Sequence, residues 1–125
     1  SGFGLAATDV AHHICAALDA THLSLDGVSE STLLDAYHSS LCDAMVRFGV
    51  ASDPEAAAKH IYPRATLQAQ YETAVIDMCR LVFAYQWSRA RFGQPNLNRN
   101  SYNKSLRSAL WLTGRCDALL KARGL

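Results

Sequence analysis

Apolar residues recur at three- and four-residue steps along most of the chain, and no stretch alternates apolar and polar residues over six positions. This spacing predicts helices, because it gathers apolar side chains on one side of each helix. The expected fold class is therefore all-α, a bundle of about four to five helices with one long central helix. At this length, we expect residues 1–125 to form a single helical domain.

The first two helices are each predicted from a cap and an apolar stripe. The first opens after Thr8, where Asp9 favours the positive end of the helix dipole, and it stops before His22. The second runs from about Glu30 to Gly49, which stands where a left-handed C-terminal cap belongs. The side chains expected on its buried side are Leu34, Tyr37, Leu41, Met45 and Phe48.

A short helix and then the longest one are predicted in the middle of the chain. Ser52-Asp53-Pro54-Glu55 combines a capping box with Pro in the first turn, which marks a short helix to about His60. From about Pro63 to Arg89, a continuous helix would be about 39 Å long. One of its faces carries Leu67, Tyr71, Ala74, Val75, Met78, Val82 and Tyr85, and the opposite face carries Ile76, Cys79, Phe83 and Trp87.

A helix that is apolar on two sides is normally packed between other elements. The long helix is therefore expected either to be the axle of this bundle or to pack one face on something absent from this chain. Residues 90–101, which are rich in Gly, Pro, Asn and Ser, are expected to form a loop. A last helix from about Tyr102 to Ala122 would bury Leu106, Ala109, Leu110, Leu119 and Leu120.

Charge is divided unevenly along the chain, although the formal net charge is only +1. Residues 1–77 hold ten acids and three bases, whereas residues 78–125 hold one acid and nine bases. The near-zero total excludes a uniformly basic surface for a polyanion but leaves a local one open. We interpret the division chiefly as intramolecular complementarity, with an acidic pocket wall as a second possibility.

The four cysteines, Cys15, Cys42, Cys79 and Cys116, include no C-x-x-C pair. A zinc site needs converging ligands, and the spacing of His38 and Cys42 supplies only two, so no metal site is expected. Free and mostly buried thiols in a reducing, cytoplasmic compartment are the first expectation, and a disulfide pair is the alternative. The apolar runs are far shorter than the roughly 20 residues that span a bilayer, so no membrane partner is expected.

Four segments, in order, resemble a known kinase superfamily. Gly2–Ala11 resembles the segment after the metal-binding Asp in aminoglycoside phosphotransferase and choline kinase-like proteins, closest to the CHK kinase-like or ecdysteroid-kinase-like branch. The other segments are Leu33–His38, Tyr71–Arg80 and Ala109–Leu112. The resemblance implies that this chain is the substrate-side, C-terminal helical part of an ATP-dependent small-molecule kinase, a phosphotransferase to a hydroxyl acceptor.

The same resemblance implies that the chain is inactive alone and holds no catalytic residue. The nucleotide-binding lobe, the His-x-Asp catalytic loop and the metal-binding Asp would all precede Ser1, so ATP and Mg would be bound in the parent protein. The implied partners are the missing N-terminal kinase portion and a small-molecule acceptor. By this resemblance, Asp9 braces the catalytic-loop backbone without doing chemistry, and one wall of the acceptor pocket carries Asp77, Trp87 and Trp111.

The nature of the acceptor stays open at this point. Aromatic faces suit a quaternary ammonium group and acidic residues suit a polyamine, whereas a steroid-like acceptor requires an apolar lining. For Asp77, the structural alternative is an ion pair with Arg80, three residues further along the helix.

A second function, from another class, is a self-contained helical interaction module that binds an anionic partner through its basic C-terminal third. Aromatic residues are interleaved with the bases there, as in surfaces for single-stranded nucleic acid. The bases are nevertheless spaced like the solvated side of a helix and loop, so we do not expect a nucleic acid partner. They are Arg89, Arg91, Arg99, Lys104, Arg107, Arg115, Lys121 and Arg123.

Overall fold

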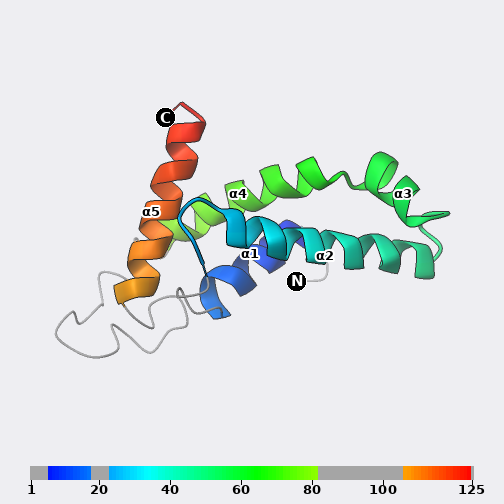
Figure 1. Cartoon of the computed structure of the whole chain (residues 1–125), viewed down its shortest axis with the longest axis horizontal. Coiled ribbons are helices and arrows are strands. Elements are labelled where there is room, and N and C mark those ends of the chain that lie inside the picture. Colours follow the sequence, from blue (N-terminus) through cyan, green and yellow to red (C-terminus); the bar gives the residue numbers. More distant parts are fainter. Residues whose placement is uncertain (1–5, 18–22, 82–105, 125) are drawn as a thin grey trace.

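The computed structural model describes residues 6–17, 23–81 and 106–124, and these stretches contain helices and turns with no strand. The all-α prediction is confirmed. The elements, shown in Figure 1, are α1 (Ala6–Ala17), α2 (Val28–Arg47), α3 (Pro54–Ala56), a π-helical segment (Ala57–Ile61), α4 (Arg64–Leu81) and α5 (Leu106–Ala122).

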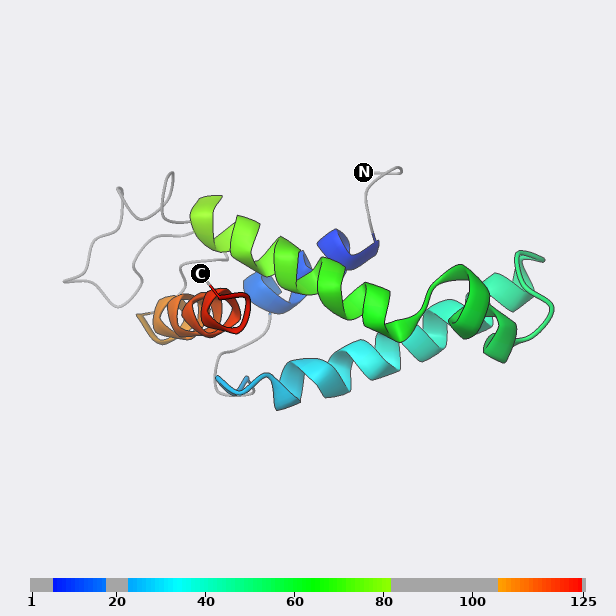
Figure 2. The same cartoon turned by 90° about the horizontal axis from the view of Figure 1, so that it is seen from above.

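Helix α4 is the central element, because α1, α2 and α5 all pack against it. Helix α2 runs alongside α4 and is joined to it by α3 and the π-helical segment at one end of the molecule, while α5 crosses α4 near the opposite end (Figures 1 and 2). The expected central helix is therefore present, at 18 described residues. The last eight residues of the expected helix, 82–89, lie outside the described residues.

One hydrophobic core is built from α1, α2, α4 and α5. On α4, the predicted face is buried as far as it is described, and Cys79 of the opposite face is buried as well. Ile76, also on that second face, is partly buried against the core. Val82, Phe83, Tyr85 and Trp87, which complete the two predicted faces, lie outside the described residues.

Local backbone chemistry explains where α2 begins and ends. It begins at Val28, two residues before the predicted start, because Asp26 accepts a hydrogen bond from the Val28 N–H at 3.0 Å and Gly27 adopts a φ of 80°. At its C-terminus, Gly49 has a φ of 77°, and the Val50 N–H donates to the Met45 carbonyl oxygen at 2.8 Å. These contacts form a Schellman motif, so the predicted left-handed cap at Gly49 is confirmed.

The predicted short helix is present but divided. Asp53 is its N-cap and accepts from the Ala56 N–H at 2.7 Å, whereas Glu55 pairs with Lys59 at 2.6 Å. After one α-helical turn, the backbone widens into the π-helical segment that ends at Ile61. Sequence spacing does not reveal this change, since the same residues fit either helix type.

Two residues predicted to be buried are exposed. Phe48 is 77% exposed because it is the C-cap residue of α2, beyond the stretch of the helix that packs on α4. Leu110 is 61% exposed because it points about 100° away from the buried Ala109 around α5. On the predicted buried side of α5, Ala109 and Leu119 are buried and Leu120 is partly buried, while the side chain of Leu106 is not described.

Two apolar residues, one in α2 and one at its C-cap, allow a direct test of which side chains are buried. Leu34 is fully buried, so Leu34→Ala should lower the free energy of unfolding by about 2–5 kcal/mol. Phe48→Ala should change it by less than about 0.5 kcal/mol, although more atoms are removed. Urea denaturation followed by circular dichroism measures both values, and similar losses would contradict the structure.

Candidate functional site

A fully buried carboxylate joins three helices. Glu30, in the first turn of α2, is 0% exposed. Its Oε2 accepts from the Tyr71 hydroxyl of α4 at 2.5 Å, and its Oε1 accepts from Nε of Arg115 of α5 at 2.5 Å. A buried charge without a partner is strongly unfavourable, so both contacts are needed for Glu30 to be accommodated in the core.

The start of α2 is shaped to receive Arg115. A Cβ atom added to Gly27 would lie 2.9 Å from Cζ of Arg115, which is closer than non-bonded carbons approach each other. Gly27 is thus required both for its positive φ and for the space that the guanidinium fills. Glu30 follows in the first turn, where the helix dipole favours a negative charge.

Two other titratable groups near Glu30, the Tyr71 hydroxyl and the Cys15 thiol, stay neutral near pH 7. Burial, then the charge of Glu30, raises the pKa of the Tyr71 hydroxyl far above its usual range. Burial, again followed by the charge of Glu30, raises the pKa of the Cys15 thiol to about 12. Neither group can serve as a general base or nucleophile at neutral pH, so the arrangement suits a structural role in holding the helices together.

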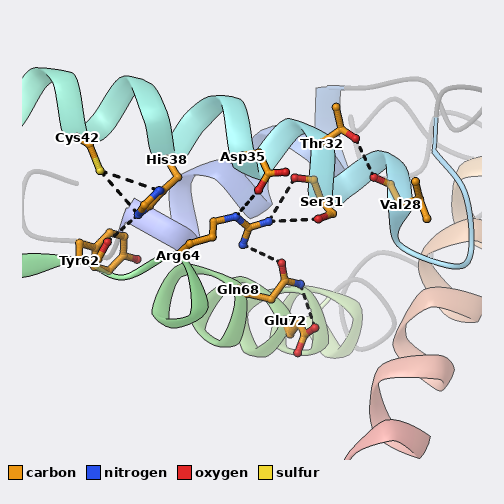
Figure 3. Close-up of polar contacts among 10 residues, drawn as sticks. All are labelled: Val28, Ser31, Thr32, Asp35, His38, Cys42, Tyr62, Arg64, Gln68 and Glu72. Carbon is orange, nitrogen blue, oxygen red and sulfur yellow. Dashed lines mark hydrogen bonds and ion pairs between the residues drawn. The ribbon is translucent and has the colours of Figure 1, made fainter. Parts of the chain in front are cut away.

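A second polar set lies at the interface of α2 and α4 (Figure 3). Nε of Arg64 donates to Asp35 at 2.7 Å, its Nη1 donates to Gln68 at 2.9 Å, and its Nη2 donates to the carbonyl oxygen of Ser31 at 3.3 Å. Gln68 in turn donates to Glu72 at 3.0 Å. The Asp35 side chain is mostly exposed, so water screens this ion pair and leaves it a small contribution to stability.

His38 fastens α2 to the segment that precedes α4 (Figure 3). The imidazole is buried, with Nε2 2.7 Å from the carbonyl oxygen of Tyr62. Because a carbonyl oxygen only accepts, Nε2 carries the proton. Cys42 lies 3.8 Å from the same nitrogen, and within the described stretches no group of three metal-ligating side chains includes this pair or any other.

The residues expected from the kinase resemblance have separate surroundings. Asp9 is exposed on the first turn of α1. The Asp77 side chain is 58% exposed and pairs with Arg80 at 3.5 Å, which is the structural alternative expected for it. Trp111 is 7% exposed and donates from Nε1 to the carbonyl oxygen of Ser24 at 3.2 Å, so it is part of the core.

No hydrogen bond or ion pair within the described part of the chain joins any two of Asp9, Asp77 and Trp111. The remaining candidate, Trp87, lies outside the described residues. The structure therefore leaves Asp9 and Asp77 accessible on the surface and turns Trp111 inward.

The described bases of the C-terminal third have partners within the chain. Arg115 is bound to Glu30, Lys121 pairs with Asp117 at 2.8 Å, and Arg123 donates to Thr73 of α4 at 2.9 Å. The pair of Glu30 and Arg115 joins the acidic first part of the chain to the basic last part. Arg89, Arg91, Arg99 and Lys104 lie outside the described residues, and the side chain of Arg107 is not described.

Sequence analysis missed the buried pair of Glu30 and Arg115, although a signal for it exists. Glu30 stands one turn before the buried Leu34, and Arg115 stands between the buried Leu112 and Leu119. Each of these charged residues therefore lies on the same side of its helix as the buried apolar residues. A charged residue of each sign on two such sides is a pattern that indicates a buried ion pair.

The buried pair makes a sharp stability prediction. Glu30→Ala or Arg115→Ala should each lower the free energy of unfolding by about 3–5 kcal/mol, because the remaining charge is left buried without its partner. The double variant Glu30→Ala/Arg115→Ala should lose much less than the sum of the two single losses. Lys121→Ala, in an exposed pair, is the matched control and should cost less than about 1 kcal/mol.

Chemical denaturation of the four variants gives the required free energies. An additive double variant, or a loss in Lys121→Ala as large as in Arg115→Ala, would contradict a buried charge pair.

The raised pKa of Tyr71 predicts a loss of stability in alkaline solution. Its pKa is higher in the folded than in the unfolded chain, so its contribution is complete below about pH 10 and is lost as the pH rises further. Between about pH 10 and pH 11, Tyr71→Phe should therefore lose free energy of unfolding less steeply than the wild type, by up to about 1.4 kcal/mol per pH unit. Urea denaturation at each pH tests this, and equal slopes would refute it.

Comparisons with protein-family models, with curated proteins and with solved structures found no match. Within the described residues, no helix is long and apolar enough to cross a membrane. The function of this chain has therefore to be argued from its own residues and their arrangement.

Proposed function

We propose that this chain is the substrate-side helical part of an ATP-dependent small-molecule kinase that transfers phosphate to a hydroxyl acceptor. In this proposal the chain is catalytically inactive alone. ATP and Mg²⁺ are bound by the N-terminal kinase portion that precedes it, and that portion is its principal partner.

The observation that carries the proposal is that the four segments that resemble the kinase superfamily pack together in one core. Gly2–Ala11, Leu33–His38, Tyr71–Arg80 and Ala109–Leu112 are far apart in the sequence, yet each contributes side chains to the same hydrophobic core. Among these core residues are Val10, Ala11, Leu34, Tyr71, Val75, Met78, Trp111 and Leu112. Motifs that occur in order within one family domain have to fold together into one unit.

The position of Asp9 supports the same proposal. Its neighbours Ala7, Val10 and Ala11 face the core, whereas Asp9 faces solvent on the first turn of α1. An exposed carboxylate at that position is free to accept hydrogen bonds from a backbone segment outside this chain. In the proposed kinase, that segment is the catalytic loop, which Asp9 holds in place without touching the reacting atoms.

The acceptor-binding wall is proposed to include Asp77, whose exposed carboxylate lies in the C-terminal part of α4. Trp111 supports this wall from within the core, since its indole faces inward. Trp87 completes the proposed set. An acidic wall favours a cationic acceptor, such as one with an amine group, over a steroid-like one.

The kinase is further proposed to act in the cytoplasm. Its four cysteines are all free, and a reducing compartment keeps thiols in that state. The alternative is a basic interaction module, and three of its bases, Arg115, Lys121 and Arg123, are bound within the chain.

The test uses the longer protein that contains this chain. The segment before Ser1 should contain a His-x-Asp sequence followed by Asp-Phe, and the long protein should transfer the γ-phosphate of ATP to an amine-bearing alcohol. Asp9→Asn should lower its kcat by about 10- to 100-fold, because a displaced catalytic loop misplaces the reacting groups. Asp77→Asn should raise KM for the cationic acceptor with a smaller effect on kcat.

Asp43→Asn, which changes an exposed acid on α2, is the matched control and should leave both constants unchanged. Absence of the two upstream motifs, or no phosphate transfer by the long protein, would overturn the proposal.

A further inference from the structure

His38 and Cys42 form a buried pair on one face of α2 (Figure 3). They are four residues apart in a helix, so their side chains project from the same side of it. His38 is 8% exposed and Cys42 is 4% exposed. The Cys42 sulfur lies 4.0 Å from Nδ1 and 3.8 Å from Nε2 of the imidazole. The two side chains are therefore in contact and shielded from solvent.

The tautomer of His38 leaves one nitrogen able to bind a metal ion. Nε2 donates its proton to the carbonyl oxygen of Tyr62 at 2.7 Å, so Nδ1 carries an unshared electron pair. A metal-binding histidine is usually held in this way, by a hydrogen bond from its other nitrogen to a carbonyl or carboxylate oxygen. Among the residues that the structure describes, Cys42 is the one polar partner of Nδ1.

The distance between the imidazole nitrogen and the sulfur suits an ion that bridges them. Bonds from a metal ion to an imidazole nitrogen and to a thiolate sulfur are about 2.0 and about 2.3 Å long. Together they reach about 4.3 Å, slightly more than the 4.0 Å between Nδ1 of His38 and Sγ of Cys42. One ion can therefore contact both atoms while the two residues keep their places on α2.

We propose that His38 and Cys42 bind one soft monovalent metal ion, Cu(I), between Nδ1 and Sγ. On binding, the S–H bond of Cys42 breaks and its proton passes to the solvent, while a Cu–S bond and a Cu–N bond form. The copper stays Cu(I), so no electron is transferred. This inference is independent of the proposed kinase activity, because it depends only on these two side chains.

The charge of the ion follows from the burial of its ligands. A Cu(I) ion bound to one thiolate and one neutral imidazole has no net charge, whereas Zn²⁺ on the same ligands leaves an unpaired charge in the interior, which is strongly unfavourable. Zinc also requires about four ligands, and within the described stretches no third histidine, cysteine or carboxylate joins this pair. Thiolate is a soft ligand and selects Cu(I).

Competition for copper measures the binding. The reduced full chain is titrated anaerobically against the Cu(I) complex of bicinchoninate, whose colour fades as the protein withdraws copper. Cys42→Ala should weaken the binding of one ion by about 100-fold or more, because a two-point chelate becomes a single contact. His38→Gln, whose amide can still donate to Tyr62, should weaken it similarly. Cys79→Ala, at a cysteine of nearly equal burial toward the C-terminal end of α4, is the matched control and should retain the ion.

Nuclear magnetic resonance of the histidine side chains supplies a second measurement on the unaltered protein. It needs no substitution at the site, so it decides the question even where a variant fails to fold. Cu(I) should shift the Nδ1 signal of His38, while the signals of His60, which is exposed on the π-helical segment, should stay in place. Zn²⁺ at the same concentration should produce no comparable shift at His38.

The results that would overturn the proposal are distinct from a failure of the kinase proposal, because none of them involves phosphate transfer. They are an unchanged Nδ1 signal of His38 at saturating Cu(I), equal copper affinity in the wild type and a folded Cys42→Ala, or loss of the ion in Cys79→Ala but not in Cys42→Ala. An equal response of His38 to Zn²⁺ would overturn the assignment to a monovalent ion.

Discussion

The whole assembly depends on one buried carboxylate. Glu30 is in the first turn of α2, and its two oxygens receive Tyr71 from α4 and Arg115 from α5. Apolar contacts alone leave helices free to slide, since dispersion and burial have no direction. A carboxylate with two fixed donors does specify direction, so it sets where α2, α4 and α5 meet. Gly27 is needed for the same contact, because its lack of a side chain leaves the space that the Arg115 guanidinium fills.

The helices and several of their ends could be predicted from sequence because the signals are local, but α1 begins at Ala6, before the cap predicted at Thr8. The Gly49 cap depends on residues within one turn, and the structure contains it. The short helix also begins where Ser52-Asp53-Pro54-Glu55 predicts, but its N-cap is Asp53 and the expected capping box of Ser52 and Glu55 is not formed. The exposure of Phe48 and Leu110 could not be predicted this way, since it depends on where a neighbouring helix ends or crosses. The division of the short helix into α-helical and π-helical turns likewise has no pattern of its own in the sequence.

The candidate sites also differ in whether they depend on neighbouring residues or on the packing of distant helices. The Asp77–Arg80 ion pair follows from helical spacing and is present. The Glu30–Arg115 pair joins residues 85 positions apart, and only the crossing of α5 over α4 brings them together. Trp111 illustrates why residue type misleads: its aromatic ring suits a ligand pocket, but the indole N–H reaches the Ser24 carbonyl and the ring fills the core.

The uneven charge along the sequence is part of what attaches α5 to the other helices. The sequence interval between α4 and α5 is long, so the position of α5 depends on noncovalent contacts: Arg115 with Glu30, Arg123 with Thr73, and the packing of Cys116 against the hydrophobic core. An ion pair in the core holds its geometry only while the surrounding groups stay uncharged, and burial keeps Tyr71 and Cys15 neutral.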